Sequence, residues 1–314
     1  MMEERLQRGF TLLELMVSVV LIAAIMGMVI AVADQVSGIW RGTASKIEQF
    51  SEARNAFDAL SRRLSQATLN TYWDYDYDDL GHPRRYIRQS ELRFVCRRGE
   101  AGSQELFFQA PFGYSETRKG MSAALNTWGY YVEYGDDSGS RPPFVQTRPR
   151  WRFRLMEYME PSERFTVYTS GSEWELPMGG DRRRYAHVLA ENIIAFVALP
   201  RLSPREDAAG TALAPGYEYD SGADDPPDRS AALSTKNQLP PVVQVAVVAI
   251  DEASALRMSA NDIEAVKTRL DHLFRDAGHF AADLTRSAGG DGSLEAVLIA
   301  RKINYHIFTT NVLL

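Results

Sequence analysis

The segment from Arg8 to Asp34 reads RGFTLLELMVSVVLIAAIMGMVIAVAD, and the interpretation of the whole chain depends on it. No charged residue occurs from Leu15 to Ala33. A helix over residues 10–33 would be about 36 Å long, which is enough to cross a bilayer. Glu14 lies at the edge of this run, where a carboxylate is costly in a membrane. Its presence therefore calls for an explanation.

Two interpretations give Glu14 no role. A Sec signal peptide would use Ala31-Val32-Ala33 as its cleavage site, but the apolar run is longer than the usual 7–15 residues or so. The side-chain charges before Gly9 also cancel, whereas a signal peptide begins with net positive charge. A plain membrane anchor fits the length of the run and leaves Glu14 unexplained, although an acid near a helix end can reach the interface.

A third interpretation follows from the order of residues 8–14: a basic residue, Gly, Phe, Thr, two Leu and Glu, then the apolar run. This order resembles the type III signal of type IV pilins and type II secretion pseudopilins. The resemblance implies that a prepilin peptidase cuts after Gly9 and methylates the new N-terminal residue, Phe10. It also implies that Glu14 meets the N-terminal amine of a neighbouring subunit at assembly. Such a buried pair would set register more than it would add stability.

The resemblance extends to a subtype. The closing INYHIFTTNVLL at 303–314 resembles the last strand of J-type minor pseudopilins, and the general layout resembles a pilin-like component of the Verru_Chthon cassette. K-type pseudopilins usually lack the acid that Glu14 supplies, and many major pilins have paired cysteines, whereas this chain has only Cys96. One departure is that no proline, which kinks many pilin helices, occurs from Phe10 to Ala67. The expectation is a large minor pseudopilin.

Apolar residues continue at helical spacing after Asp34, with charged residues on the opposite face. We predict one helix from Phe10 to Ala67, in which residues 10–33 form a transmembrane or filament-core half and 34–67 an amphipathic spine, after a cleaved leader at 1–9. The apolar stripe should pack under an antiparallel sheet, because it has no other partner in a monomer. The stripe residues used in this prediction are Phe50, Phe57, Leu60 and Leu64.

Residues 68–314 are predicted to form a β-rich periplasmic head. Alternating, β-branched and aromatic segments predict strands at 91–96, 105–112, 129–134, 151–159, 164–169, 187–202, 241–251 and 294–314. Residues 211–238 predict a long loop, and 260–277 an amphipathic helix capped by Asn261 with Glu264 three positions later. The predicted fold class is therefore α+β: a long N-terminal helix packed on an antiparallel sheet, shaped like the lollipop of a pilin.

The composition and motifs point away from catalysis. The chain has 314 residues and a net charge of −6, which disfavours a nucleic-acid carrier. The nucleophile-elbow, zinc-protease, P-loop and dinucleotide motifs are absent, so we expect no enzyme and no cofactor. Cys96 lies in a strand-like segment and is expected to be a small buried hydrophobe. His272 and His279, seven residues apart, are interpreted as solvated helix-end residues rather than metal ligands.

Two charged stretches leave alternatives open. Some pseudopilins bind calcium in a loop, and the acidic segment 218–228 offers a candidate site or simply a solvated loop. Its candidate ligands are Asp220, Asp224, Asp225 and Asp228. In RPRWRFRL at 148–155, alternation places the four arginines on one face of a strand. That face would be either an ordinary solvated surface or a phosphate-binding one.

Two functions remain as hypotheses. The first is a non-catalytic minor pilin or pseudopilin, anchored once in the inner membrane and built into a type II secretion or type IV pilus-like filament. Its partners would be the prepilin peptidase, sibling subunits and the inner membrane, with nucleic acid not expected. The second is a membrane-anchored or secreted β-rich binding protein such as an adhesin. The state of the mature N-terminus distinguishes them.

Overall fold

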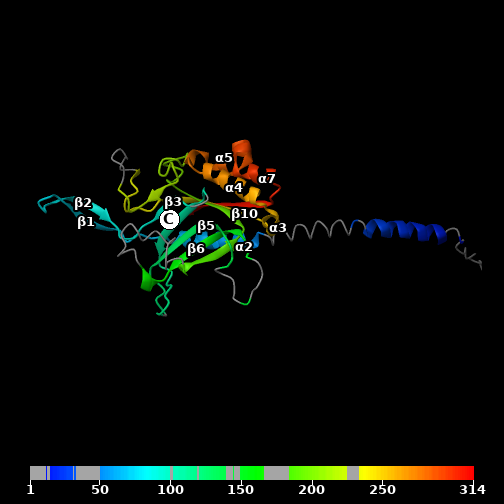
Figure 1. The fold of residues 1–314 in the computed structure, drawn as a ribbon, viewed down its shortest axis with the longest axis horizontal. Helices are drawn as coiled ribbons and strands as arrows, with labels where there is room; N and C mark the ends of the chain where they lie inside the picture. The colour runs from blue at the N-terminus through cyan, green and yellow to red at the C-terminus, as the bar shows by residue number, and fades with distance from the viewer. Residues whose placement is uncertain are drawn as a thin grey trace, which may run out of the picture. The chain divides into compact units, whose positions relative to one another are not determined.

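The computed structural model describes residues 12, 15–30, 32, 50–99, 102–118, 120–138, 144, 149–165, 184–224 and 233–314. The chain divides into an N-terminal unit, residues 1–49, and a body, residues 50–314 (Figure 1). The fold class is α+β, as predicted, because helices in both units accompany antiparallel sheets in the body.

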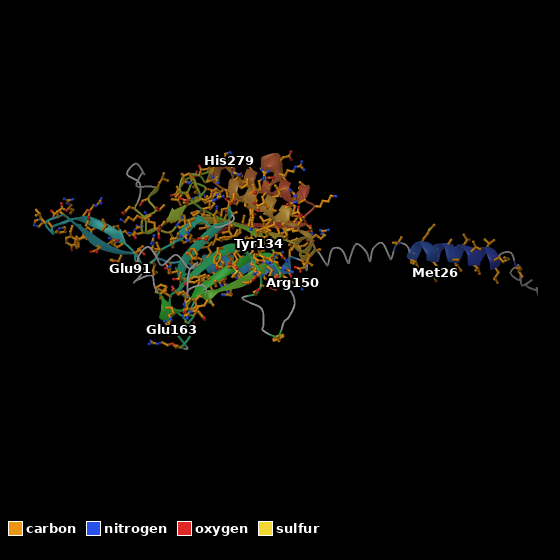
Figure 2. All side chains as sticks on the ribbon, viewed as in Figure 1. Met26, Glu91, Tyr134, Arg150, Glu163 and His279 are labelled. Carbon is orange, nitrogen blue, oxygen red and sulfur yellow. The ribbon has the colours of Figure 1, made fainter. Side chains whose placement is uncertain are left out.

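Residues 15–30 of the N-terminal unit are helical, as Figure 2 shows around Met26. All large apolar side chains in this stretch are exposed, from 52% for Val17 to 71% for Met28. No helix in the described part of the chain is both long and apolar enough to span a membrane. Gly9, Phe10 and Glu14 lie outside the described residues.

The body begins with α2 (Ser51–Leu64), which ends three residues before the predicted Ala67. The prediction that one helix runs from Phe10 to Ala67 depends on residues 33–49, which lie outside the described residues. The acidic Glu52 in the first turn and Arg62 and Arg63 in the last turn complement the helix dipole.

Two larger sheets and a separate hairpin make up the β-structure, and every strand pair is antiparallel. The six-stranded sheet has the order β7-β6-β5-β4-β3-β9, and the three-stranded sheet has the order β11-β10-β8. The strands of the six-stranded sheet are β3 (Val95–Arg98), β4 (Gln104–Ala110), β5 (Asn126–Gly135), β6 (Arg152–Glu160), β7 (Ala186–Glu191) and β9 (Tyr219–Asp220). The others are β8 (Ile193–Arg201), β10 (Val242–Ile250), β11 (Tyr305–Leu313) and the hairpin pair β1 (Tyr72–Tyr77) and β2 (Pro83–Gln89).

The chain passes from one sheet to the other at Asn192, so the single strand predicted over 187–202 is two strands. Asn192 has a φ of 61°, a conformation that Asn tolerates better than most residues. Its N–H donates to Phe153 O of β6 over 2.8 Å, and its C=O accepts from Ile250 N of β10 over 2.9 Å. One residue therefore joins the two sheets by backbone hydrogen bonds.

The main core lies between the two sheets and under α2. Phe196 of β8 faces Tyr130 of β5, with ring centroids 6.4 Å apart, and both rings are fully buried. From α2, Leu60 and Leu64 are fully buried, and Phe57 packs against Phe308 of β11 at 5.7 Å between centroids. The prediction that the spine stripe packs on an antiparallel sheet is confirmed. A smaller core covers the other face of the six-stranded sheet.

Five α-helices lie between β10 and β11: α3 (Glu252–Arg257), α4 (Ala260–His272), α5 (Phe280–Leu284), α6 (Arg286–Gly289) and α7 (Leu294–Ala300) (Figure 1). The predicted helix over 260–277 corresponds to α4, but its cap is Ser259 with Asp262, which form a capping box. The predicted cap, Asn261 with Glu264, is therefore wrong by two residues.

Several strand predictions were also wrong. Residues 294–300 form α7, because Leu294 and Leu298 share a buried helical face and the Ser293 side chain caps the Ala296 N–H. Only Val95 and Cys96 of the predicted strand 91–96 lie in β3, and the predicted strand 164–169 falls mostly outside the described residues. The hairpin of β1 and β2 was not predicted at all.

Candidate functional site

The described part of the N-terminal unit is apolar on every side. A helix of this kind is stable in an apolar environment, such as a membrane or a bundle of other helices, rather than in water. Ser18 is the only residue with a polar side chain from Leu15 to Ile30. The helix that follows the predicted processing site thus presents apolar side chains around its circumference.

α2 is attached to the body by a polar cluster around Glu157 of β6, a carboxylate only 2% exposed. Trp128 Nε1 and the Tyr130 hydroxyl, both from β5, each donate to Glu157 Oε1 over 2.9 Å. His187 Nε2 of β7 lies 2.9 Å from Glu157 Oε2. Arg63, in the last turn of α2, forms an ion pair with the same carboxylate. Helix and three strands therefore meet at one buried charge.

The titration of this cluster favours the charged pair. Burial opposes the negative charge of Glu157, but hydrogen bonds from His187 and Trp128 and the attraction of Arg63 lower its pKa overall. Burial likewise opposes the charge on Arg63, yet its contacts with Tyr130 and Glu157 raise its pKa. Burial raises the pKa of Tyr130 well above its usual value, so the hydroxyl remains a donor.

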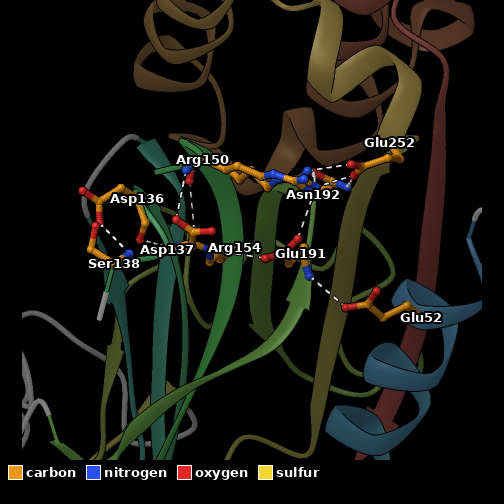
Figure 3. Close-up of polar contacts among 10 residues, drawn as sticks. Glu52, Asp136, Asp137, Ser138, Arg150, Arg154, Glu191, Asn192 and Glu252 are labelled. Atoms are coloured by element: carbon orange, nitrogen blue, oxygen red, sulfur yellow. Dashed lines mark hydrogen bonds and ion pairs between the residues drawn. The ribbon is translucent and has the colours of Figure 1, made fainter. Parts of the chain in front are cut away.

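A second polar network contains Arg150, Arg152 and Arg154 of RPRWRFRL (Figure 3). Arg152 and Arg154 of β6 are 6% and 2% exposed, so the interpretation of a solvated or phosphate-binding face is wrong for these two. Arg152 forms an ion pair with Glu252 of α3, and its Nη1 lies 3.2 Å from Glu191 Oε2. Arg154 Nε lies 3.8 Å from the other oxygen of Glu191.

The same network reaches the first turn of α2, because the Glu191 N–H donates to Glu52 Oε1 over 3.1 Å. Asn192 Nδ2 donates to Glu252 Oε2 over 3.0 Å, which ties the junction between the sheets to α3. Arg150 remains exposed, and its N–H donates to Asp137 Oδ1 over 2.9 Å. Arg148 lies outside the described residues. The buried arginines thus connect β6 to β7 and α3.

Two of the four proposed calcium ligands, Asp220 and Asp224, lie within the described residues, and each has a cationic partner. Asp220 Oδ2 pairs with Arg93 Nη2 at 2.6 Å, and its other oxygen accepts from Gly222 N at 2.7 Å. Asp224 forms an ion pair with Lys236. Asp225 and Asp228 lie outside the described residues. Each described carboxylate therefore has a side-chain cation as its partner, and calcium binding by the full set of four stays a prediction.

The remaining candidates from the sequence are the histidines and Cys96. No group of three or more His, Cys, Asp or Glu side chains within the described ranges could hold a metal ion. His279 Nδ1 lies 3.2 Å from Asp276 Oδ2, and both side chains are solvent-exposed. Cys96 is 1% exposed, and its Sγ lies 3.4 Å from Ala198 O. Burial raises the pKa of this thiol, so the prediction of a buried small hydrophobe is confirmed.

Comparison with known proteins identifies the N-terminal segment. Residues 5–30 match the family model for the prokaryotic N-terminal methylation motif. The match covers Gly9, Phe10, Glu14 and the described helix at 15–30. No curated protein and no solved structure matches the chain significantly. The motif therefore supports a prepilin-type N-terminus, and the match does not extend into the body.

The Glu157 cluster was missed by sequence reasoning, although a signal exists. Glu157 is the only charged residue in the segment LMEYM at 155–159 of β6. A carboxylate at such a position must find buried partners or lose its charge. The sequence alone does not say that Arg63, 94 positions earlier, is one of them.

Proposed function

We propose that the chain is a minor pilin or pseudopilin that a prepilin peptidase processes after Gly9. Phe10 would become the methylated N-terminus of the mature protein. The mature subunit would be held once in the inner membrane with its body in the periplasm. It would then be built into, or onto the tip of, a type II secretion or type IV pilus-like filament. Its function would be structural and non-catalytic.

The observation that carries the proposal is the methylation motif leading directly into a helix with exposed apolar side chains. In a Sec signal peptide the apolar run is removed, whereas a prepilin leader ends before it. Retention of the run gives the mature subunit a way to remain in the membrane and, after assembly, to pack among the helices of its neighbours. Glu14 would then have a role as the partner of a neighbour's N-terminal amine.

The body supports a structural role. α2 is the first element of the body, and its buried stripe and its ion pair with Glu157 fix it to the sheets. Within the Glu157 cluster, and separately within the Arg152 network, the polar side chains bind one another. Such internal pairing is suited to a rigid body. We therefore infer that the body is a rigid head joined to the filament-forming segment through α2.

The test is the mass of the mature N-terminal peptide from cells that contain the cognate peptidase. N-methylated Phe10 is the result expected. A peptide beginning at Asp34 would indicate Sec cleavage, and an intact Met1 would indicate a plain anchor. Either of these would refute the pilin proposal and favour the membrane-anchored or secreted β-rich binding protein. Cells lacking the peptidase provide the control, because there the leader should remain attached.

A further inference from the structure

The hairpin of β1 and β2 stands apart from the two larger sheets. It forms a two-stranded sheet of its own and projects beyond the rest of the body in Figure 1. Contacts at its base hold it: Asn237 Nδ2 donates to Arg88 O over 2.6 Å, and the Tyr72 hydroxyl donates to Glu91 Oε1 over 2.9 Å. A lone hairpin is marginally stable in water. The choice of exposed side chains on the hairpin therefore calls for an explanation other than the stability of the hairpin.

The two faces of the hairpin differ sharply in chemistry. Trp73 lies opposite Arg88 and Tyr75 lies opposite Tyr86, so these four share one face. Alternation adds Tyr77 and Arg84, beside the irregularity in register between Asp76 and Tyr77. We call this set the aromatic face: Trp73, Tyr75, Tyr77, Arg84, Tyr86 and Arg88. All six side chains are exposed, including 67% of Trp73 and 64% of Tyr86.

The rings of the aromatic face hold one another in place. Tyr75 and Tyr86 have centroids 4.7 Å apart, and their hydroxyl oxygens are 2.9 Å apart. The guanidinium carbon of Arg88 lies 5.7 Å from the centre of the Trp73 ring. Rings ordered in this way lose little further conformational entropy when a partner covers them.

The distribution of charge indicates what kind of partner fits. The aromatic face contains two arginines and no carboxylate, whereas Asp74 and Asp76 lie on the opposite face with Arg85. There, Arg85 Nε pairs with Asp76 Oδ2 at 3.0 Å. A ligand for the aromatic face should therefore supply carboxylates of its own. Residues 72–89 contain four aspartates and three arginines, so the two arginines of the aromatic face suit carboxylates spaced along a ligand better than the continuous phosphate charge of nucleic acid.

We propose that the aromatic face binds a segment of a partner protein in which carboxylates alternate with apolar or aromatic side chains. Trp, Tyr and Arg are the residues that contribute most to protein–protein binding energy. A face built on two short strands is smaller than the ~800 Å² per partner of a standard interface, so binding should be weak and reversible. The proposal is independent of the pilin function and would hold equally for an adhesin.

The test measures binding of a labelled synthetic peptide of alternating glutamate and tyrosine to the full-length protein in detergent micelles. Empty micelles provide the blank. The matched probes are a lysine–tyrosine peptide and a single-stranded oligothymidine. The variant is Arg84→Ser with Arg88→Ser, and its control is Arg85→Ser, which removes one positive charge from the same strand on the opposite face. Circular dichroism verifies that each variant is folded.

The glutamate–tyrosine peptide should bind, less tightly at higher salt, and the double variant should weaken binding about tenfold. Arg85→Ser should change it less than about twofold. Trp73→Ala, which keeps both arginines, should also weaken binding. Equal binding of the lysine–tyrosine peptide, preferential binding of oligothymidine, no peptide binding, or an equal effect of Arg85→Ser would overturn the proposal.

Discussion

Replacing Glu157 with Gln should weaken the body more than any surface carboxylate change. The amide keeps the shape but removes the charge. Its oxygen can still accept from Trp128 Nε1 and the Tyr130 hydroxyl, and its NH₂ group can face His187 Nε2, but Arg63 loses its counter-charge. Breaking a buried ion pair costs about 3–5 kcal/mol. The Arg63 side chain is 33% exposed, so water would partly solvate the abandoned guanidinium. We therefore expect a loss of about 2–3 kcal/mol.

The assay is urea-induced unfolding of the full-length protein in detergent micelles, followed by tryptophan fluorescence. Glu264→Gln is the control, because Glu264 is exposed on α4 and its replacement should change the unfolding free energy by less than about 0.5 kcal/mol. A loss for Glu157→Gln below about 1 kcal/mol would refute the reasoning, because a charge with these four partners cannot be removed so cheaply.

The stability difference between wild type and Glu157→Gln should depend on pH. The pKa of Glu157 is lowered in the folded state, so its charge contributes stability that is complete above the unfolded value of about 4.3. That contribution is lost as the pH falls through the folded pKa. The stability difference between wild type and Glu157→Gln should therefore shrink below about pH 4. A difference that stays constant from pH 7 down to pH 3 would contradict this assignment.

Three further outcomes are expected. Gly9→Leu should block maturation, and unchanged processing on a gel in cells with the cognate peptidase would count against the prepilin proposal. Glu14→Ala should be cleaved normally but cross-link poorly to sibling subunits. Assembly equal to wild type would mean that Glu14 is only an acid at the membrane interface, without a role in pairing. Gly129→Ala should cost about 1–3 kcal/mol in urea unfolding, because a Cβ there would lie 2.3 Å from the buried Phe107 ring. Gly216→Ala, where nothing lies within 4 Å, is its control and should be nearly neutral.

Local patterns in the sequence were sufficient for α2 and for several central strands, although they failed for α7, which was predicted as a strand. The stripe through Phe57, Leu60 and Leu64 identified the buried face of α2, and alternation located β4, β5, β6 and β10 to within a few residues. The methylation motif was recognisable because it depends on residue order in one short segment. These features are encoded within a dozen residues, so a single sequence reveals them.

The failures concern interactions between distant positions. Arg152 and Arg154 resembled a solvated face, but Glu191 and Glu252, which neutralise them, come from β7 and α3. Likewise, the sequence did not show that Asp220 pairs with Arg93, 127 positions earlier, while its role as a calcium ligand stays a prediction. The hairpin was missed for a different reason. Its alternation sets aromatic rings against aspartates, and the aromatic face is exposed instead of buried, which is the opposite of the usual strand pattern.

The contacts of α2 explain how this fold could bear a mechanical load. Any pull on the chain before Phe50 must enter the body through α2, because α2 is its first element. Glu52 accepts a hydrogen bond from β7 at one end, Phe57 packs on β11 in the middle, and Arg63 pairs with β6 at the other. Withdrawing the helix would expose Leu60 and Leu64 and leave Glu157 buried without its ion pair, so these costs arise together. A load on the helix is thus shared between both sheets, which Asn192 joins by backbone hydrogen bonds.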